Sequence, residues 1–346
     1  MTEAPNRQLD RAKGALLAGA LGDALGMPTQ SCTPEEISDA FGSISDFVTP
    51  VQGHPIAHGL IAGSVTDDTE QTLLLAKHII SSPGCFNEEG WASSLIAWEK
   101  SVKERGLYDL LGPSTKRALE ALLAGTHPAE TGLQGDTNGA AMRIAPVGIA
   151  TPVNSVPALI SEVETTCRIT HNTPIAISSA SAVAAVVSAG IDGANVGQAI
   201  EHALTASNSV GKRFGSGVDF VERLELAFSV ARESYQHTIL DNIRRAIGTS
   251  VASNESVPAA FALLKFTNGD AWNAGVLAAN LGGDTDTIGA IAAGMCGAIS
   301  GASHLPSGKL VKLKNINQSE IDEIASGLLR VRQMRAEAGE RMENAV

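Results

Sequence analysis

The sequence predicts a largely helical, all-α protein, and three observations support this prediction. Apolar residues recur at helical spacing over most of the 346 residues. Hydrophobic residues make up 44% of the chain but aromatic residues only 4%, so Ala, Leu, Val and Ile dominate, and Ala is the strongest helix former. Strands and helices do not alternate regularly, which argues against a doubly wound sheet. No low-complexity linker divides the chain, so we expect one domain over residues 1–346.

The N-terminal part is expected to hold two helices and a long loop. The first helix is predicted at Arg11–Leu25 and ends at Gly26–Pro28. The second begins at Thr33–Glu36, a capping box with proline in the first turn. Gly42–Val65 is rich in Gly, Pro, Val and Ile and should be a long loop with one short strand at Ser45–Val48. Long ordered loops are often functional, so this loop is a candidate lid over a substrate.

Helical periodicity returns after this loop and continues almost to the C-terminus, interrupted by clusters of Gly, Pro, Asn and Asp. The further helices are expected at Asp67–Ile80, Glu88–Glu104, Ser114–Leu123, Asn138–Ile149, Val156–Cys167, Pro174–Gly190, Val196–Ala206, Val218–Ser234, Ile239–Ile247, Val257–Phe266, Trp272–Asn280, Thr285–Ser300 and Glu320–Arg341. Two stretches of small residues, 176–190 and 289–302, should pack closely at the centre. The last helix is rich in Arg, Glu and Met and is expected to be a solvated terminal element.

Charge and composition exclude several classes of partner. The formal net charge is −12 and no run of Lys or Arg is present, which disfavours nucleic-acid binding. The N-terminus lacks an apolar signal core, and the longest apolar run, Ile288–Ile299, is too short to span a membrane. The four cysteines are far apart in sequence and form no CxxC pair. We therefore expect a cytoplasmic protein with reduced thiols.

The first acidic motif, Thr66-Asp67-Asp68-Thr69-Glu70, follows the long loop and opens a helix. Acids in the first turn of a helix are favoured by its dipole, so a simple helix cap is one interpretation. The other interpretation is a site for a hard cation, because two carboxylates and a hydroxyl suit Mg²⁺, Mn²⁺ or Ca²⁺ better than Zn²⁺.

The second motif, Gly282-Gly283-Asp284-Thr285-Asp286-Thr287, repeats this chemistry after a Gly-Gly turn. One cap needs one acid, so two acids and two hydroxyls exceed the requirement. An EF-hand is disfavoured because no Glu closes the loop. A phosphatase-type DxDxT site is disfavoured because residues 278–283 do not form a good strand. Taken together, the two motifs could form a two-cation centre that activates a water and binds substrate oxygens.

Further segments give the chain a resemblance to a known family. In chain order, they are Gly19–Pro28 (GALGDALGMP), TDDT at 66–69, Gly112–Thr115 (GPST), Asn138–Pro146 (NGAAMRIAP), Thr170–Pro174 (THNTP) and GGDTDT at 282–287. Their sequences and order resemble ADP-ribosylglycohydrolases, the family that includes the enzyme reversing nitrogenase reductase modification. The resemblance covers roughly residues 12–302.

This resemblance implies an orthogonal multi-helix bundle and a binuclear centre of two Mg²⁺ or Mn²⁺ ions. The implied metal ligands are Thr66, Asp67, Asp68, Asp284, Asp286 and Thr287. It further implies that Asn138, Gly139 and Met142 border the ribose or diphosphate and that His171 lies beside the substrate. Apart from the resemblance, Asn138-Gly139 could be a turn before a helix, and His171 could be a cap before Pro174.

Gln30 departs from the pattern of this family. Relatives usually carry Glu two residues after the Pro of GDALGMP, near the metals, whereas this chain has Gln30. An amide can bind a substrate or metal through its carbonyl but cannot act as a base. Either Asp286 or Asp67 therefore takes the proton, or the substrate differs.

Three functions remain open at this stage, all with a ribosyl or ADP-ribosyl ligand. The first is removal of ADP-ribosyl groups from a protein side chain or small molecule, by hydrolysis at the anomeric carbon with a metal-activated water. The second is hydrolysis of a smaller N-riboside, which Gln30 and the acidic charge favour. The third is a non-catalytic protein that binds metal or ADP-ribose. The sequence does not fix the oligomeric state.

Overall fold

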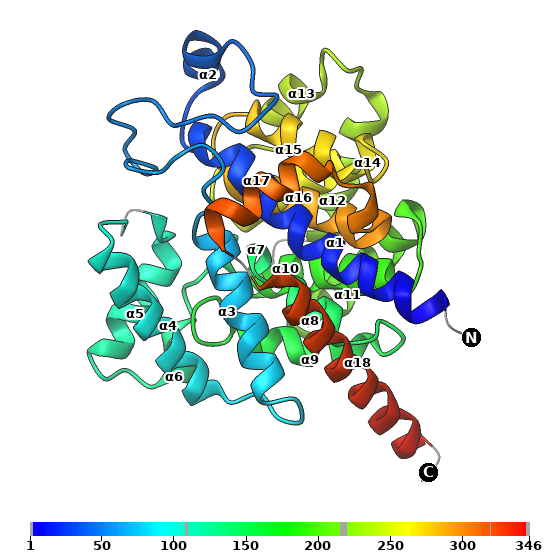
Figure 1. Ribbon diagram of the computed structural model, residues 1–346. Coiled ribbons are helices and arrows are strands. Elements are labelled where there is room, and N and C mark those ends of the chain that lie inside the picture. The colour runs from blue at the N-terminus through cyan, green and yellow to red at the C-terminus, as the bar shows by residue number, and fades with distance from the viewer. Residues whose placement is uncertain (1–2, 108–109, 215–219, 319, 344–346) are drawn as a thin grey trace.

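The computed structural model describes residues 3–107, 110–214, 220–318 and 320–343, and within these ranges it is built from helices (Figure 1). This confirms the all-α prediction for the described part of the chain. In order, the helices are α1 (Glu3–Gly26), η1 (Met27–Thr29), α2 (Pro34–Phe41), α3 (Asp67–Ser81), α4 (Glu88–Glu104), α5 (Pro113–Leu123), α6 (Pro128–Thr131), α7 (Gly139–Met142), α8 (Ala145–Ala150), α9 (Val156–Cys167), α10 (Pro174–Ile191), α11 (Val196–Phe214), α12 (Phe220–Glu233), α13 (Ile239–Ala246), α14 (Ser253–Phe266), α15 (Ala271–Ala279), α16 (Thr285–Ser300), η3 (Ala302–His304), α17 (Ser307–Asn317) and α18 (Ile321–Glu343).

Most predicted helices are present, and α4, α9 and α16 have the predicted boundaries. The predicted helix Asn138–Ile149 is instead two short helices, α7 and α8, and Pro146 lies in the first turn of α8. Proline is favoured at a helix start and disfavoured inside a helix, which explains the break. Conversely, α14 begins at Ser253 and accommodates Pro258 in its interior, so its predicted start at Val257 is late. Residues 218 and 219 of the predicted helix Val218–Ser234 lie outside the described residues.

Two α-helices have no counterpart in the prediction. They are α6 and α17. Only Leu313 of α17 is buried, so this Lys-rich helix carries no apolar stripe that a sequence pattern could detect. Such a helix depends on contacts from other parts of the chain for its stability.

The predicted strand at Ser45–Val48 is wrong. The neighbouring Ile44 does not pair with another strand. Its N–H donates to the Asn280 side chain at 2.7 Å and its carbonyl accepts from the same amide at 2.8 Å. Phe47 packs edge-on against Trp272, with 6.2 Å between ring centroids. The Asn280 side chain thus satisfies the backbone of Ile44 in place of a partner strand, and residues 45–48 remain part of the loop between α2 and α3.

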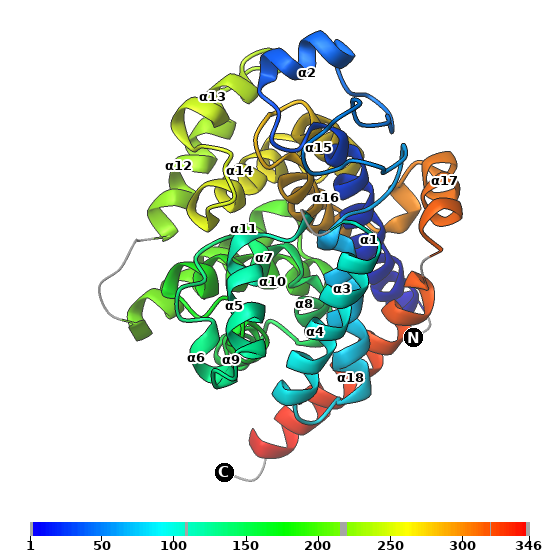
Figure 2. The ribbon, with the colours of Figure 1, turned by 90° about the vertical axis from the view of Figure 1, so that its left-hand side faces the viewer.

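The expected solvated C-terminal helix is also wrong in part. Figures 1 and 2 show α18 running along the end of the molecule opposite α2, and its first half is part of the core. Leu328 and Val331 are buried there, and Arg332 is only 5% exposed. Arg332 donates to the carbonyl of Thr151 at 2.8 Å and forms an ion pair with Asp192. These contacts fix α18 against the chain after α8 and α10.

The centre of the fold is the contact between α1 and α16, which lie side by side in Figures 1 and 2. A Cβ on Gly22 would lie 2.1 Å from the carbonyl oxygen of Gly289, and one on Gly26 would lie 2.3 Å from that of Thr285. The two backbones therefore touch, as the small-residue pattern at 289–302 predicts. The other small-residue helix, α10, is buried from Ala176 to Ile191 and packs against α16.

One helix of the described residues, α10, is long and apolar enough to cross a membrane by length and composition. In the structure 89% of that window is buried inside the protein. Burial of this extent is what a central core helix shows.

Gly22→Ala should destabilise the protein, because the new methyl group would collide with backbone rather than with a movable side chain. We expect a loss of about 1–3 kcal/mol, the usual range for overpacking. Gly19→Ala is the matched control, since its Cβ would lie 3.5 Å from the carbonyl oxygen of Ala290, an ordinary contact. The control should be neutral or gain about 0.5–1 kcal/mol from helix propensity. Urea unfolding monitored by circular dichroism measures both, and equal effects would contradict the close contact.

Candidate metal centre

Asp23 of α1 fixes the start of α3. Its carboxylate is fully buried and accepts from the backbone N–H of Thr66 at 3.0 Å and from that of Thr69 at 3.1 Å. The hydroxyls of both threonines donate to it as well. A carboxylate at this position satisfies the free N–H groups of a helix start. The acidic motifs do not include Asp23, and its one signal in the sequence is an acid within the otherwise apolar surface of α1.

The first motif uses this fixed helix start to present Asp67 and Asp68. One oxygen of Asp68, Oδ2, accepts from the hydroxyls of Thr66 at 3.2 Å and Thr287 at 3.3 Å. Its other oxygen, Oδ1, is buried and has no hydrogen-bond partner. Oδ2 of Asp67 accepts from Gln71 at 3.2 Å. The Asp68–Thr287 bond therefore joins the two motifs, which are far apart in sequence.

The second motif is set by its two glycines, which both have a φ of +80°. A Cβ on Gly283 would lie 2.4 Å from the carbonyl oxygen of Thr249. Glycine is therefore required at 283 both by its positive φ and by this close contact. After this turn the backbone N–H of Asp284 donates to that same carbonyl at 2.8 Å. Asp284 is the N-cap residue of α16, but its side chain makes no capping bond and instead accepts from the amide of Asn138.

Asp286 differs from the other acids because neither of its carboxylate oxygens has a hydrogen-bond partner, although the residue is 0% exposed. An unpartnered buried carboxylate is costly, and native structures rarely retain one without a role. Together with Asp68, it supplies free acceptor oxygens at the junction of the two motifs.

The electrostatics of the site are those of crowded, desolvated acids. Burial, and then repulsion between neighbouring carboxylates, raises the pKa values of Asp67, Asp68 and Asp286 well above their usual range. Burial also raises the pKa of Asp23 to about 6 and that of Asp284, where the Asn138 amide opposes the shift. In the described part of the chain, none of these five carboxylates forms an ion pair with Lys, Arg or His.

The residues present fit one or two hard divalent cations. Carboxylate, hydroxyl and amide oxygens are the ligands that Mg²⁺ and Mn²⁺ prefer, and a cation would remove the repulsion among the acids. Over the described ranges, no three Asp, Glu, His or Cys side chains already converge as a ligand set. Thr66, Thr287, Gln30 and water would therefore have to complete the coordination, as is usual for Mg²⁺.

Of the predicted substrate residues, Asn138 precedes α7, whereas Gly139 and Met142 are the first and last residues of that helix. His171 lies between α9 and α10. Asn138 directs its amide to Asp284 and, at 2.8 Å, to the hydroxyl of Ser256, and makes no side-chain cap to α7. His171 is fully buried and does not cap α10, which is capped by Thr173. The simple interpretation of His171 as a helix cap is therefore wrong, and the Asn138 amide is committed to the acidic site rather than to its own turn.

Gly139 and Met142 are brought to the same place. A Cβ on Gly139 would lie 2.8 Å from the His171 ring, which explains the need for glycine. Met142 is 8% exposed, and its carbonyl oxygen accepts from the Thr72 hydroxyl at 3.4 Å. The NGAAM segment thus lies between His171 and the helix that carries the first acidic motif.

Gln30 follows η1 and is 9% exposed. Its Oε1 is buried without a hydrogen-bond partner, and its side chain lies close enough to Asp284 to lower the pKa of that acid. The adjacent Ser31 donates its N–H to the carbonyl of Gly283 at 2.7 Å. Gln30 is therefore held beside the second motif. His54 of the long loop lies 4.0 Å from the sulfur of the nearby Cys32, while the lid function of that loop stays a prediction.

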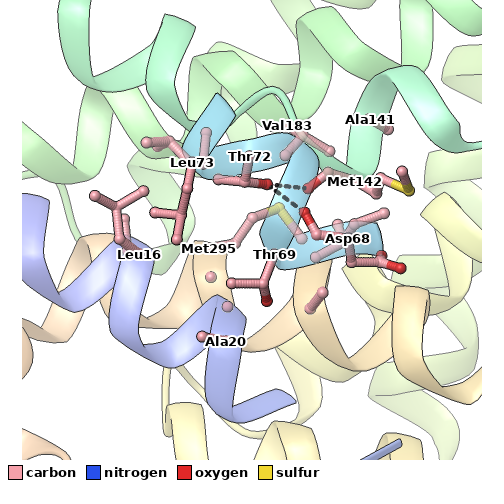
Figure 3. A pocket seen from close by; sticks show the side chains of 17 residues that line it. Leu16, Ala20, Asp68, Thr69, Thr72, Leu73, Ala141, Met142, Val183 and Met295 are labelled. Carbon is pink, nitrogen blue, oxygen red and sulfur yellow. Dashed lines mark hydrogen bonds between the residues drawn. The ribbon is translucent and has the colours of Figure 1, made fainter. Parts of the chain in front are cut away.

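A small, mainly apolar cavity lies on the inner side of the first motif (Figure 3). Its volume is about 20 Å³, and its wall includes Asp68, Thr69, Met142 and Met295. This volume is enough for about one water molecule and far too small for a ribosyl group. Asp68 itself is 2% exposed, and this burial strengthens the electrostatic interactions of its carboxylate.

Comparisons with known proteins identify the family. The profile of the family described as ADP-ribosylglycohydrolase matches residues 4–338. The chain belongs to the ADP-ribosylglycohydrolase family. The uncharacterized protein YegU of Escherichia coli (strain K12) is 32% identical to it over 336 residues, which are 94% of this chain and 98% of YegU. A protein of Pseudomonas putida (strain GB-1) named ADP-ribosylarginine hydrolase Tri1 is 30% identical over 318 residues, 88% of this chain and 74% of that protein.

A solved structure titled ADP-ribosylglycohydrolase-related protein complex has the same fold. The TM-score is 0.70 and the sequence identity 25%, over 94% of this chain and 99% of the other. The all-α bundle of the family is thus confirmed. Family membership supports a hydrolase that acts on glycosidic bonds of ADP-ribosyl groups.

Asp286→Asn should stabilise the metal-free protein, because a neutral amide removes repulsion and can donate to neighbouring carboxylates. A hydrogen bond to a charged group contributes about 1.5–3 kcal/mol, which sets the expected gain in the free energy of unfolding with EDTA present. Asp192→Asn is the control, since Asp192 is paired with the buried Arg332 and its neutralisation should lower stability. Urea unfolding at neutral pH compares the two variants, and a destabilised Asp286→Asn would argue against uncompensated repulsion.

Proposed function

We propose that this protein is a metal-dependent glycohydrolase that cleaves the anomeric bond of an ADP-ribosyl or related ribosyl group. One observation carries the proposal: two acidic helix starts meet through the Asp68–Thr287 hydrogen bond and leave buried, unpartnered oxygens on Asp68 and Asp286. Family membership supports the reaction class, and the excess of uncompensated carboxylate supports the requirement for a cation.

The residues that would hold the ions are those of the two motifs. They are Thr66, Asp67, Asp68, Asp284, Asp286 and Thr287. Two Mg²⁺ or Mn²⁺ ions would supply positive charge for binding ribose hydroxyls and for lowering the pKa of a water. Both the number of ions and their identity belong to the proposal.

Side chains of the protein would carry out the remaining steps. Asp286 has free carboxylate oxygens and is the best-placed group to accept the proton of the attacking water, with Asp67 as the second candidate. The same group of carboxylates would stabilise the positive charge that develops on the ribosyl ring as the bond to the leaving group breaks. Asn138, bound to Asp284, would hold that acid in place and present the Gly139 segment to the substrate.

The leaving group we propose is a guanidinium or another nitrogen on a modified side chain, since a relative with most of its length aligned is named ADP-ribosylarginine hydrolase. A smaller N-riboside is the second candidate. Gln30 favours it, because the residue expected to be Glu in this family is here an amide. The cytoplasmic location stays a prediction that rests on the sequence.

Asp286→Ala should abolish turnover while the protein still folds, because the substitution removes a proposed ligand and proton acceptor. EDTA should inhibit the wild type, and Mg²⁺ or Mn²⁺ should restore activity. Release of ADP-ribose from ADP-ribosylarginine measures turnover, and circular dichroism measures the fold. Near-normal activity of the variant, or activity that EDTA leaves unchanged, would refute the proposed metal centre.

Gln30→Glu restores the residue that relatives usually carry, and it tests both the effect of the amide and the class of substrate. If the amide limits the reaction, the variant should gain turnover on ADP-ribosylarginine but not on a panel of nucleosides. The wild type is assayed on both substrate sets with Mg²⁺ or Mn²⁺. Nucleoside turnover without ADP-ribosylarginine turnover would favour the N-riboside alternative, and no turnover with retained ADP-ribose binding would favour a non-catalytic role.

A further inference from the structure

We propose that Arg143 is a positioning residue that fixes the direction of a buried hydrogen-bond chain with one end at Asp67 and the other at His171 and Thr137. The proposal rests on the function proposed above and gives roles to Gln71, Arg143, Thr170 and Thr137, which the proposed metal and substrate sites do not use. Its members, in order, are Asp67, Gln71, Arg143, Thr170, His171 and Thr137.

Arg143 is a buried cation with neutral partners. It is 1% exposed, donates from Nη1 to Oε1 of Gln71 at 2.6 Å and from Nη2 to the hydroxyl of Thr170 at 2.5 Å. Its guanidinium also lies 5.6 Å from the centroid of the Trp91 ring. Among the described residues, no carboxylate forms an ion pair with it. Burying an unpaired guanidinium is costly, so its presence beside an acidic site calls for a specific role.

The direction of the first arm follows from the fact that a guanidinium can only donate. Burial lowers the pKa of Arg143 to about 10, so it is protonated at neutral pH. Gln71 must therefore turn its carbonyl oxygen to Arg143 and its NH₂ group to Asp67. As a result Asp67 receives a hydrogen bond on Oδ2, and the charge of Arg143 acts on this acid through one intervening amide. This arm holds the Asp67 carboxylate in one orientation.

The second arm runs from Arg143 to Thr137, which directly precedes the predicted substrate residue Asn138. The Thr170 hydroxyl accepts from Arg143, so its own hydrogen is available to Nδ1 of His171, which lies 2.8 Å away. Burial lowers the pKa of His171 well below its usual value, so the ring is neutral and carries one proton. With Nδ1 accepting from Thr170, that proton is on Nε2. Nε2 then donates to the Thr137 hydroxyl at 3.1 Å. The Thr137 hydroxyl keeps its own hydrogen for an acceptor beyond the chain.

Through the two arms, Arg143 sets the hydrogen-bond direction both at Asp67 and at His171. Reversing Gln71 would place its carbonyl against Asp67 and add repulsion to an already crowded group of acids. Reversing the Thr170–His171 bond would place the proton on Nδ1 and remove the donor from the Thr137 side. Because Arg143 cannot accept, a reversed Gln71 would turn its NH₂ group against the guanidinium. A reversed Thr170 would leave its own buried hydrogen without an acceptor in the chain, since Arg143 cannot take it.

The first experiment measures metal affinity rather than turnover. Gln71→Met preserves the length of the side chain but removes both amide groups, and we expect Mg²⁺ or Mn²⁺ to bind about 10–100-fold more weakly by isothermal titration calorimetry. Gln333→Met, on the exposed face of α18, is the matched control and should bind as the wild type does. Unchanged affinity of Gln71→Met would overturn this arm. Absence of metal binding by the wild type would instead refute the proposed function.

The second experiment reads the proton of His171 directly and needs no metal. Long-range ¹⁵N–¹H NMR of the wild type should show Nε2 protonated and Nδ1 as an acceptor. Thr170→Val removes the donor to Nδ1 and should lose this signature. Thr166→Val is the matched control, since its hydroxyl is also buried but donates to the Val163 carbonyl at 3.0 Å. A wild-type proton on Nδ1, or an unchanged signature in Thr170→Val, would overturn the second arm.

Discussion

The close contact between α1 and α16 determines where the chemistry of this protein can lie. At Gly22 and Gly26 the two backbones touch without intervening side chains. The hydroxyl of Thr285 donates to the carbonyl of Gly26 at 2.8 Å and so fixes the start of α16 against the end of α1. A larger residue at either glycine would separate these helix ends, and with them Asp23 from the second acidic motif.

From this contact the rest of the site follows through hydrogen bonds between helix ends. Asp23, on α1, holds the start of α3, and Asp68 of α3 then meets Thr287 of α16. Three helices are thus tied by groups that are also charged and buried. Folding must offset the desolvation of these acids with the apolar core around them, which is possible in a chain of this size. Packing of the apolar core therefore offsets the unfavourable free energy of burying these carboxylates, and a bound cation would reduce that free energy.

The sequence predicts the periodic part of this structure well and the connecting part poorly. Long amphipathic or small-residue helices such as α9, α10 and α16 follow from local pattern, because burial repeats along them. The strand predicted at Ser45–Val48 is wrong. The backbone of the preceding residue, Ile44, bonds to the side chain of the distant Asn280 and not to a partner strand, which no local pattern shows. The two acidic motifs are visible in the sequence because they contain more acids and hydroxyls than a helix cap needs. The role of Asp23, in contrast, depends on the contact between α1 and the start of α3.

Gln30 stands where relatives usually carry Glu, and this difference changes the chemistry beside Asp284 without removing the oxygen there. A carboxylate in its place would add a further acid beside Asp284, whose pKa is already raised by burial. An amide avoids that repulsion, and its buried Oε1 remains an unused acceptor. The position therefore keeps an oxygen for a hydroxyl or a cation but cannot take up a proton. If the reaction needs a base, it must come from the carboxylates themselves, and Asp286 is the acid whose oxygens are not already engaged.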